Sequence, residues 1–336
     1  QQLKKGEYSV VVGARSAIFA PLKNLGLIIV DEEQESSYKQ ENPAPRYHAR
    51  DVAMVRGKQS NAAVLLTSAT PCLESYYNVL QNKFTLLKLT KRYGNSNYPT
   101  VELVDMKKEY SDDGSALLSK SLIQATNDRL ERSEQVIILQ NRRGYSRVHQ
   151  CLECGEIKKC KHCSVALTFH RTDNNLHCHY CEAFEIPESK CGQCNAENMT
   201  FSGSGTQRVE DVLQQQFPDA KILRMDMDTV RGKGSHIKIL EKFANGKADI
   251  LLGTQMIAKG LDFENVTLVG VINADSGLFF PDFRAGERVF QLIYQVAGRA
   301  GRRDKPGQAI IQTYNPDDIY IQTAAALNIQ KFYNIA

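Results

Sequence analysis

Eight of the nine cysteines stand in Cys-x-x-Cys pairs between residues 151 and 194. Thiolates at this spacing can share one tetrahedral zinc ion, and two such pairs complete a site. A disulfide framework is the alternative, but such frameworks belong to short secreted chains, whereas this chain has 336 residues. We therefore predict bound metal and a reducing compartment. The pairs are Cys151/Cys154, Cys160/Cys163, Cys178/Cys181 and Cys191/Cys194.

The segment between the second and third pairs predicts how the pairs combine. Residues 165–169 have the pattern of a strand and residues 172–175 that of a turn, so a hairpin brings the inner pairs together and the outer pairs meet around them. Four-thiolate zinc has no open position, which favours a structural, partner-binding or DNA-contacting role over catalysis. The expected ligands are Cys151, Cys154, Cys191 and Cys194 for one ion and Cys160, Cys163, Cys178 and Cys181 for the other, which leaves His162, His177 and His179 with no role as ligands.

An acidic cluster follows an apolar run of strand length. Residues 25–30 lead directly into Asp31-Glu32-Glu33-Gln34, which is a Walker B arrangement. Asp31 can hold the Mg²⁺ of a nucleotide and Glu32 can polarise the attacking water. The alternative is a solvated turn or a helix start. The next strand, residues 63–67, ends in Ser68-Ala69-Thr70-Pro71, where Ser68 and Thr70 can couple a nucleotide site to a moving lobe or simply cap a helix.

Further phosphate-binding candidates lie near the C-terminal end. A helical stretch over residues 291–302 carries Gln295, Arg299 and Arg302, and the two arginines are three residues apart on one face. Guanidinium groups can act as arginine fingers on a γ-phosphate, although two solvated arginines at a helix end are the alternative. A strand over residues 249–252 leads into a loop that offers amides, a hydroxyl and a cation to phosphates. Its candidates are Thr254 and Gln255 for nucleic acid and Gly260 and Asp262 for the nucleotide.

The elements that must position these residues alternate between strands and helices. This alternation on both sides of the cysteine window predicts two α/β lobes with parallel sheets, the second interrupted by the cysteine-rich insertion. The polar residues 107–115 are the expected linker. The expected strands are 8–12, 25–30, 63–67, 135–139, 221–223, 249–252 and 266–272. The expected divisions are 1–106 for lobe one, 107–150 for the linker and the start of lobe two, 151–200 for the zinc module, 201–316 for the rest of lobe two and 317–336 for the start of another domain.

Composition and charge set weaker limits. The chain is 42% hydrophobic and 24% charged, as in ordinary globular proteins, and it has no apolar run long enough to span a membrane. The formal net charge of +4 falls to about zero once eight thiolates bind two zinc ions, so nucleic-acid binding must rest on local patches. The chain begins Gln1-Gln2 without Met, so we read it as a piece of a longer protein without a signal peptide.

Aromatic and basic residues alternate between the acidic cluster and Ser68. Bases can stack on such rings while cations track the phosphates, a combination that suits single-stranded DNA. The alternative is a surface loop with half-buried tyrosines. The residues that we assign to nucleic acid here and elsewhere are Arg15, Tyr38, Lys39, Arg46, Tyr47, Arg142, Arg143, Thr206 and Gln207.

The order of these segments resembles a known set of motifs. The segments GARSA (13–17), DEEQ, SATP, NRRGY (141–145), GTQMIAKGLDF (253–263) and QVAGRAGR (295–302) resemble motifs Ib to VI of superfamily 2 helicases. More narrowly, RSAIFAP, RYHARDVA, the four cysteine pairs and PDFRAGERVF resemble the bacterial primosomal replication-restart helicases, the PriA family. The resemblance implies a 3′ to 5′ DNA helicase with RecA-like lobes, two zinc ions, ATP and Mg²⁺, located in the cytoplasm with the nucleoid. It also implies action at stalled forks, with single-stranded DNA-binding protein and primosome-loading proteins as partners.

Two departures from that family limit the expectation. The phosphate-loop motif G-x-x-x-x-G-K-[ST] does not occur in the chain. The resemblance places this loop upstream, together with DNA-binding domains. We therefore expect this chain alone to be inert as an ATPase. Gln34 stands where the family usually has His, and it can still donate one hydrogen bond and accept another toward Ser68 or Thr70. The alternatives are a non-catalytic zinc module that binds nucleic acid or proteins, and an RNA helicase of the same superfamily.

Overall fold

A computed structural model describes two units, residues 1–87 and residues 88–336, and each is considered by itself. The described residues are 2–89, 98–109, 117–140, 147–151, 153–170, 173–202, 206–226, 229–230, 235–258, 263–280, 282–301 and 305–335. No helix among them is long and apolar enough to cross a membrane.

The first unit is built on a pair of parallel strands, β1 (Leu27–Asp31) and β4 (Ala63–Thr67). Their register places Asp31 opposite Thr67, so the acidic cluster and the SATP segment leave the sheet side by side. The crossover between them contains α2 (Ala49–Ser60), which begins where the His48 side chain accepts a hydrogen bond from the Arg50 amide. Its other elements are α1 (Gln2–Lys5), the 3-10 turns η1 (Arg15–Phe19) and η2 (Ser36–Tyr38), β2 (Lys39–Gln40), β3 (Tyr47–His48) and α3 (Leu73–Leu80).

The strand expected over residues 8–12 does not form. These residues carry no strand hydrogen bonds, and the Val10 and Val12 side chains are 74% and 94% exposed. An apolar run becomes a strand only where another strand completes its backbone hydrogen bonds. In the described part of the first unit, β1 and β4 pair with each other, and residues 8–12 lie outside that pairing.

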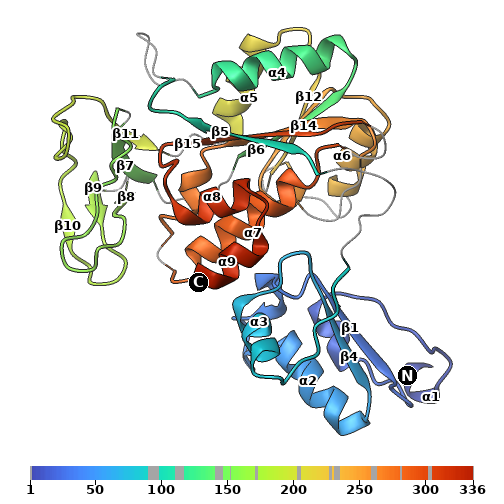
Figure 1. Ribbon diagram of the computed structural model, residues 1–336. Helices are drawn as coiled ribbons and strands as arrows, with labels where there is room; N and C mark the ends of the chain where they lie inside the picture. The colour runs from blue at the N-terminus through green and yellow to red at the C-terminus, as the bar shows by residue number, and fades with distance from the viewer. Residues whose placement is uncertain are drawn as a thin grey trace. The chain divides into compact units, whose positions relative to one another are not determined.

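The second unit contains a parallel sheet of six strands in the order β12-β13-β6-β14-β15-β5 (Figure 1). The central strands are wholly buried, which explains why they read in the sequence as apolar runs without alternation. The strands are β12 (Ile222–Met225), β13 (Ile250–Gly253), β6 (Gln135–Gln140), β14 (Val266–Ile272), β15 (Gln308–Thr313) and β5 (Thr100–Asp105).

Helices cover both faces of this sheet (Figure 1). On one face, Leu122 of α4 and Leu213 of α5 share a buried core with strand residues such as Ile138. Gly270 of β14 lies under α4, where an added Cβ would come within 2.7 Å of the Leu122 side chain. The helices are α4 (Lys120–Glu131), α5 (Thr206–Gln216), α6 (Ser235–Ala244), α7 (Ala285–Ala297), α8 (Ile319–Ala325) and α9 (Ile329–Ile335), with 3-10 turns η3 (Gln255–Ala258) and η4 (Ala274–Gly277).

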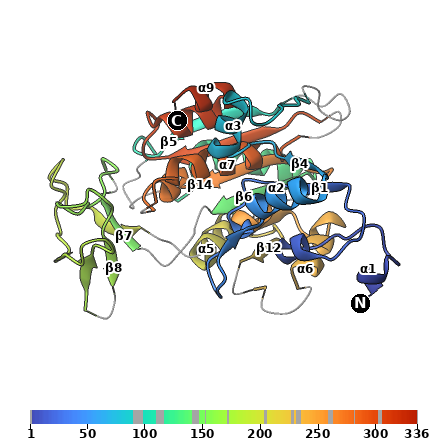
Figure 2. The same ribbon diagram turned by 90° about the horizontal axis from the view of Figure 1, so that it is seen from below.

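The cysteine-rich segment folds as a second, antiparallel sheet in the order β10-β9-β8-β7-β11 (Figures 1 and 2). Its central hairpin joins β8 to β9, as the strand-turn pattern predicted. The strands are β7 (Arg147–Cys151), β8 (Thr168–His170), β9 (Asn175–His177), β10 (Phe184–Glu185) and β11 (Met199–Ser202).

Two of the expected divisions differ from the structure. Residues 100–105 lie before the expected boundary at residue 106, but they form β5, which pairs with β15 along its whole length and so belongs to the second unit. Residues 317–336 were expected to start another domain, but α8 packs on α7, and the rings of Phe290 and Phe332 stack with centroids 4.0 Å apart. Both differences arise because the contact that decides each assignment lies far away in the sequence.

Candidate nucleotide and zinc sites

The end of β1 places Asp31 at the carboxyl edge of the parallel pair. Its Oδ1 accepts hydrogen bonds from the Thr67 hydroxyl (2.6 Å) and from the Glu32 amide (3.1 Å). Glu32 follows with φ of 48°, a left-handed conformation that is uncommon for a residue with a side chain. Ligands collect at this edge of parallel sheets, so the position of Asp31 and Glu32 suits a nucleotide-bound cation.

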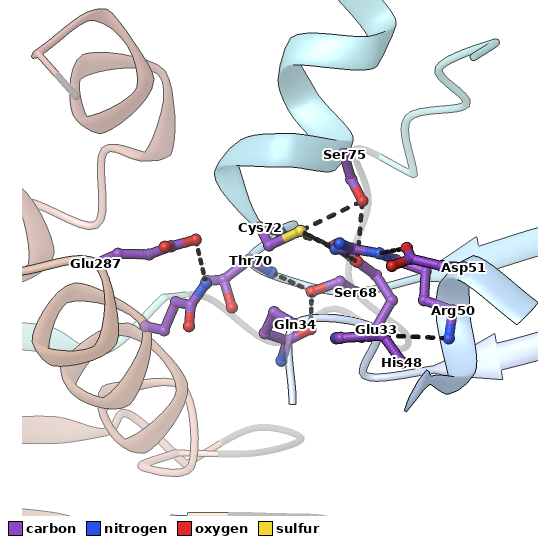
Figure 3. Close-up of polar contacts among 11 residues, drawn as sticks. Glu33, Gln34, His48, Arg50, Asp51, Ser68, Thr70, Cys72, Ser75 and Glu287 are labelled. Atoms are coloured by element: carbon purple, nitrogen blue, oxygen red, sulfur yellow. Dashed lines mark hydrogen bonds and ion pairs between the residues drawn. The ribbon is translucent and has the colours of Figure 1, made fainter. Parts of the chain in front are cut away.

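Gln34 links the acidic cluster to the SATP segment (Figure 3). Its amide nitrogen donates to Glu32 Oε2 (2.7 Å), and its amide oxygen accepts from the Ser68 hydroxyl (2.5 Å). The Ser68 oxygen in turn accepts from the Thr70 amide (2.9 Å). The structure thus brings Gln34, Ser68 and Thr70 together, in a chain of hydrogen bonds that begins at Glu32.

Glu33 is the buried member of the cluster, and sequence reasoning gave it no role. Its carboxylate is tied to two helix starts: Oε1 accepts from the Cys72 amide (2.7 Å), and Oε2 accepts from the Ser75 hydroxyl (2.9 Å) and from Arg50 (3.1 Å) (Figure 3). Glu33 is 2% exposed, so these donors replace the water that a buried carboxylate loses. No local pattern marks Glu33, because the alternation of β1, with Val30 buried and Asp31 exposed, would turn residue 33 outward.

Cys72, the cysteine outside the four pairs, belongs to this network. It is buried, and its sulfur lies 3.3 Å from Glu33 Oε2 and from the Ser75 hydroxyl and contacts the Arg50 guanidinium. Burial, and then the Glu33 carboxylate, raise the pKa of the Cys72 thiol to about 12. Cys72 therefore stays a neutral thiol and serves as packing.

The predicted nucleic-acid residues of the first unit divide into two groups. Arg15 donates to the carbonyls of Ser37 (3.2 Å) and Lys39 (2.9 Å), its guanidinium lies 5.7 Å from the centre of the Tyr47 ring, and the Tyr38 hydroxyl donates to the Asp31 carbonyl. These contacts hold the loop itself together. The side chains of Lys39 and Arg46 are exposed, so their cations face solvent.

The predicted residues of the second unit lie at the ends of its strands and helices. Thr206 begins α5 and its hydroxyl donates to Asp226, while Gln207 contacts Arg224 and Asp211. Thr254 and Gln255 follow β13, and the half-buried Gln295 lies in α7 four residues before Arg299, which is past the end of that helix. The remaining predicted residues lie outside the described part of the chain: Arg142, Arg143, Gly260, Asp262 and Arg302.

Another buried carboxylate that the sequence did not reveal is Asp275, in η4 after β14. It accepts hydrogen bonds from the Thr313 hydroxyl (2.7 Å) and from the amides of Tyr314 (2.8 Å) and Asn315 (3.1 Å). Burial raises its pKa. Asp275 joins the ends of β14 and β15, and no motif marks it because its partners lie about forty residues away.

The eight paired cysteines form two four-sulfur groups, with the inner and outer pairs combined as the hairpin predicted. Within each group all sulfur atoms lie within 4.8 Å of one another, and contacts such as Cys151–Cys194 and Cys160–Cys181 measure 3.6 Å. A tetrahedral ion with Zn–S bonds of 2.3 Å requires sulfur atoms about 3.8 Å apart, so the groups fit zinc. The groups are Cys151, Cys154, Cys191 and Cys194, and Cys160, Cys163, Cys178 and Cys181.

The same local turn presents each of the four pairs. In every pair the first cysteine's amide donates to the carbonyl five residues on, and its carbonyl accepts from the amide four residues on. The residue after each second cysteine has a left-handed φ, which the turn requires. Amide donors from Cys181 and Tyr180 lower the pKa of the Cys178 thiol to about 7, whereas contact with the Cys181 sulfur raises the pKa of the Cys163 thiol to about 12. The four residues with left-handed φ that follow the second cysteines are Gly155, Ser164, Glu182 and Asn195.

Comparison with known proteins agrees with this arrangement. Residues 193–304 match the helicase conserved C-terminal domain, and residues 160–185 match the PriA DNA helicase Cys-rich region domain. The replication restart protein PriA of Bacillus subtilis (strain 168) is 48% identical over 333 residues, which cover 99% of this chain and 41% of that protein. The chain belongs to the PriA family.

Other PriA proteins match over the same part of the chain. The replication restart protein PriA of Chlamydia pneumoniae is 46% identical (99% of this chain, 45% of the relative), and that of Haemophilus influenzae (strain ATCC 51907 / DSM 11121 / KW20 / Rd) is 44% identical (98% and 44%). The chain therefore spans less than half the length of these PriA relatives. The predicted fold class, RecA-like parallel sheets with a cysteine-rich zinc-binding module, is confirmed.

Proposed function

We propose that this chain is the motor region of an ATP-driven DNA helicase that moves 3′ to 5′ and acts in replication restart. The observation that carries the proposal is the match to PriA replication restart proteins along 98–99% of the chain. It is supported by the geometry at the end of β1, where Asp31, Glu32 and Gln34 lie against the SATP segment. The same match favours DNA over RNA as the substrate.

In this proposal Asp31 holds Mg²⁺ and Glu32 orients the water that attacks the γ-phosphate. In the described part of the chain, both hydrogen bonds to the Asp31 carboxylate use Oδ1, which leaves Oδ2 for the cation. The cation neutralises phosphate charge when bound. The Thr67 hydroxyl fixes the carboxylate in one orientation. In the second unit we propose Gln295, Arg299 and Arg302 as catalytic residues and Gly260 and Asp262 as nucleotide contacts.

Gln34 transmits the state of Glu32 to the SATP segment. A change in the hydrogen bonding of Glu32 alters the donor position of Gln34 and, through Gln34 Oε1, the hydroxyl of Ser68 and the amide of Thr70. The three hydrogen bonds share atoms or side chains in sequence, so each one affects the polarity of the next. The exposed cations Lys39 and Arg46, with Arg142 and Arg143, contact the DNA backbone in this proposal.

Two structural zinc ions occupy the cysteine groups, and the module that they fold serves as a docking platform for DNA or partner proteins. The partners that we propose are single-stranded DNA-binding protein and the primosome-loading proteins. Action on chromosomal DNA places the protein in the cytoplasm with the nucleoid. A non-catalytic zinc module is the competing function.

The test is ATP hydrolysis by the longer protein that contains this chain, measured with single-stranded DNA, with single-stranded RNA and with neither. We expect DNA to raise the rate and RNA to leave it unchanged. The 336-residue chain, which has no phosphate loop, should hydrolyse no ATP in any condition. Absence of hydrolysis by the longer protein would favour the non-catalytic module, and stimulation by RNA would favour an RNA helicase.

A further inference from the structure

The hairpin of the inner cysteine group carries three histidines that the sulfur ligands leave unused. His170 ends β8, His177 ends β9, and His179 lies between the ligands Cys178 and Cys181. Their rings gather on one side of the hairpin: His170 lies 4.6 Å from His177 and 5.1 Å from His179 between ring centres. The rings of His170 and His177 are half-exposed and His179 is exposed, so dissolved ions can reach them.

The separation of two ring nitrogens suits a metal better than it suits a hydrogen bond. Nε2 of His170 and Nε2 of His179 lie 3.4 Å apart. Hydrogen bonds from nitrogen are usually 2.7–3.2 Å long, so a direct bond between two neutral imidazoles would be a weak one. A tetrahedral zinc ion with Zn–N bonds of about 2.05 Å sets its ligand nitrogens about 3.3 Å apart. The two atoms thus have the separation of two corners of a zinc coordination shell.

The neighbouring residues restrict the ring of His170. Nε2 of His177 lies 2.5 Å from the Asp173 carboxylate, which fixes the orientation of the His177 ring. His177 packs against His170 on one side and lies 6.1 Å from the Phe184 ring on another. A ligand whose ring is held in place loses less conformational entropy when it binds a metal.

We propose that His170 and His179 form a third, labile site for a divalent transition metal, distinct from the two cysteine groups. Imidazole nitrogen is a ligand for zinc, copper and nickel, whereas Mg²⁺ and Ca²⁺ prefer oxygen. Both rings bind through Nε2 and carry their one remaining proton on Nδ1. Binding therefore releases no proton from neutral rings; one of them exchanges its N–H tautomer. Water molecules complete the shell.

This site differs from the cysteine groups in strength and in access. Two neutral nitrogens with open positions hold zinc far more weakly than four thiolates, so the third ion exchanges while the other two stay bound. The site lies on the hairpin that the inner zinc folds, because His170 ends β8 and His179 lies two residues after the end of β9.

The experiment is a zinc titration of the whole chain, followed by native mass spectrometry at rising free zinc. We expect two ions at low zinc and a third at higher zinc. His170→Ala and His179→Ala should each lose the third ion and keep the first two, which also reports that the hairpin is folded. His177→Ala should lower the affinity for the third ion without abolishing its binding.

The matched control is His162→Ala, because His162 is also an exposed histidine within a cysteine pair of the inner group. It should keep all three ions. The proposal is overturned by a wild-type chain that stops at two ions in excess zinc, or by a third ion that survives His170→Ala or His179→Ala. Loss of the third ion in His162→Ala, to the same extent as in His170→Ala and His179→Ala, would also overturn the proposal. The third ion would then depend on the charge or the stability of the module in general.

Discussion

The zinc module and the end of β1 hold their polar side chains by opposite means. The module repeats one short turn four times, and each turn closes its own backbone hydrogen bonds within five residues. The end of β1 instead depends on one buried carboxylate, Glu33, whose partners Arg50, Cys72 and Ser75 lie 17 to 42 residues away. Local repetition divides the support of the first region among four similar turns, whereas the second region fails when its centre is removed.

The largest expected effect is loss of a metal ligand. Cys178→Ser should release the inner zinc and unfold the β8–β9 hairpin, because structural zinc contributes on the order of 10 kcal/mol to folding such small modules. The zinc content of the purified chain, measured by metal analysis, should fall from two ions per chain to one. Cys72→Ser is the control for loss of a buried thiol, and it should keep both ions. Two ions in Cys178→Ser would show that the site does not depend on its four sulfurs.

The next effect concerns the centre of the other region. Glu33→Ala leaves the Arg50 guanidinium without its buried partner, and breaking such a pair costs about 3–5 kcal/mol. Hydrogen exchange of the β1 and β4 amides, followed by mass spectrometry, should become faster in the variant while exchange in β6 and β14 does not change. Glu41→Ala removes an exposed carboxylate of the same unit and should leave exchange unaltered. If the β1 and β4 amides of Glu33→Ala exchanged as slowly as those of the wild-type chain, Glu33 would not hold the unit together.

A smaller effect separates coupling from stability. In the longer protein, Gln34→Ala should lower DNA-stimulated ATP hydrolysis about tenfold, the equivalent of one lost hydrogen-bond link, and leave the basal rate nearly unchanged. Gln34→His should retain both rates at neutral pH, because neutral His also donates one bond and accepts another. A proportional fall of the two rates in Gln34→Ala would assign Gln34 to turn stability instead.

The smallest effect tests the repeated turn. Gly155→Ala should destabilise the module by about 1–2 kcal/mol, because alanine disfavours a left-handed φ and its Cβ would lie 3.0 Å from the Tyr314 side chain. Glu182→Gly, at the equivalent position of another pair, should be neutral or stabilise by less than about 1 kcal/mol. Thermal unfolding with zinc present measures both. A stabilised Gly155→Ala, or a Glu182→Gly that is clearly destabilised, would contradict the shared turn.

The same contrast explains what could be predicted from the sequence. The cysteine groups follow from local spacing and one hairpin. The expected strands 63–67 and 266–272 coincide with β4 and β14, because both are short apolar runs, and β14 is buried along its whole length. Glu33 and Asp275 were missed because their role depends on partners far along the chain. Strand β5 was not predicted, and only its pairing with β15 shows that residues 100–105 join the sheet of the second unit.

Under the proposed function, the end of β1 drives movement along DNA, and strand separation by the longer protein measures that movement. Duplexes with a single-stranded tail on either the 3′ or the 5′ side are supplied with ATP, and Glu32→Gln is compared with Glu41→Gln as a control for charge. We predict that unwinding depends on the polarity of the tail, as 3′ to 5′ movement requires. Glu32→Gln should abolish unwinding, and Glu41→Gln should preserve it. Unwinding by Glu32→Gln at the wild-type rate would show that the end of β1 does not drive movement along DNA.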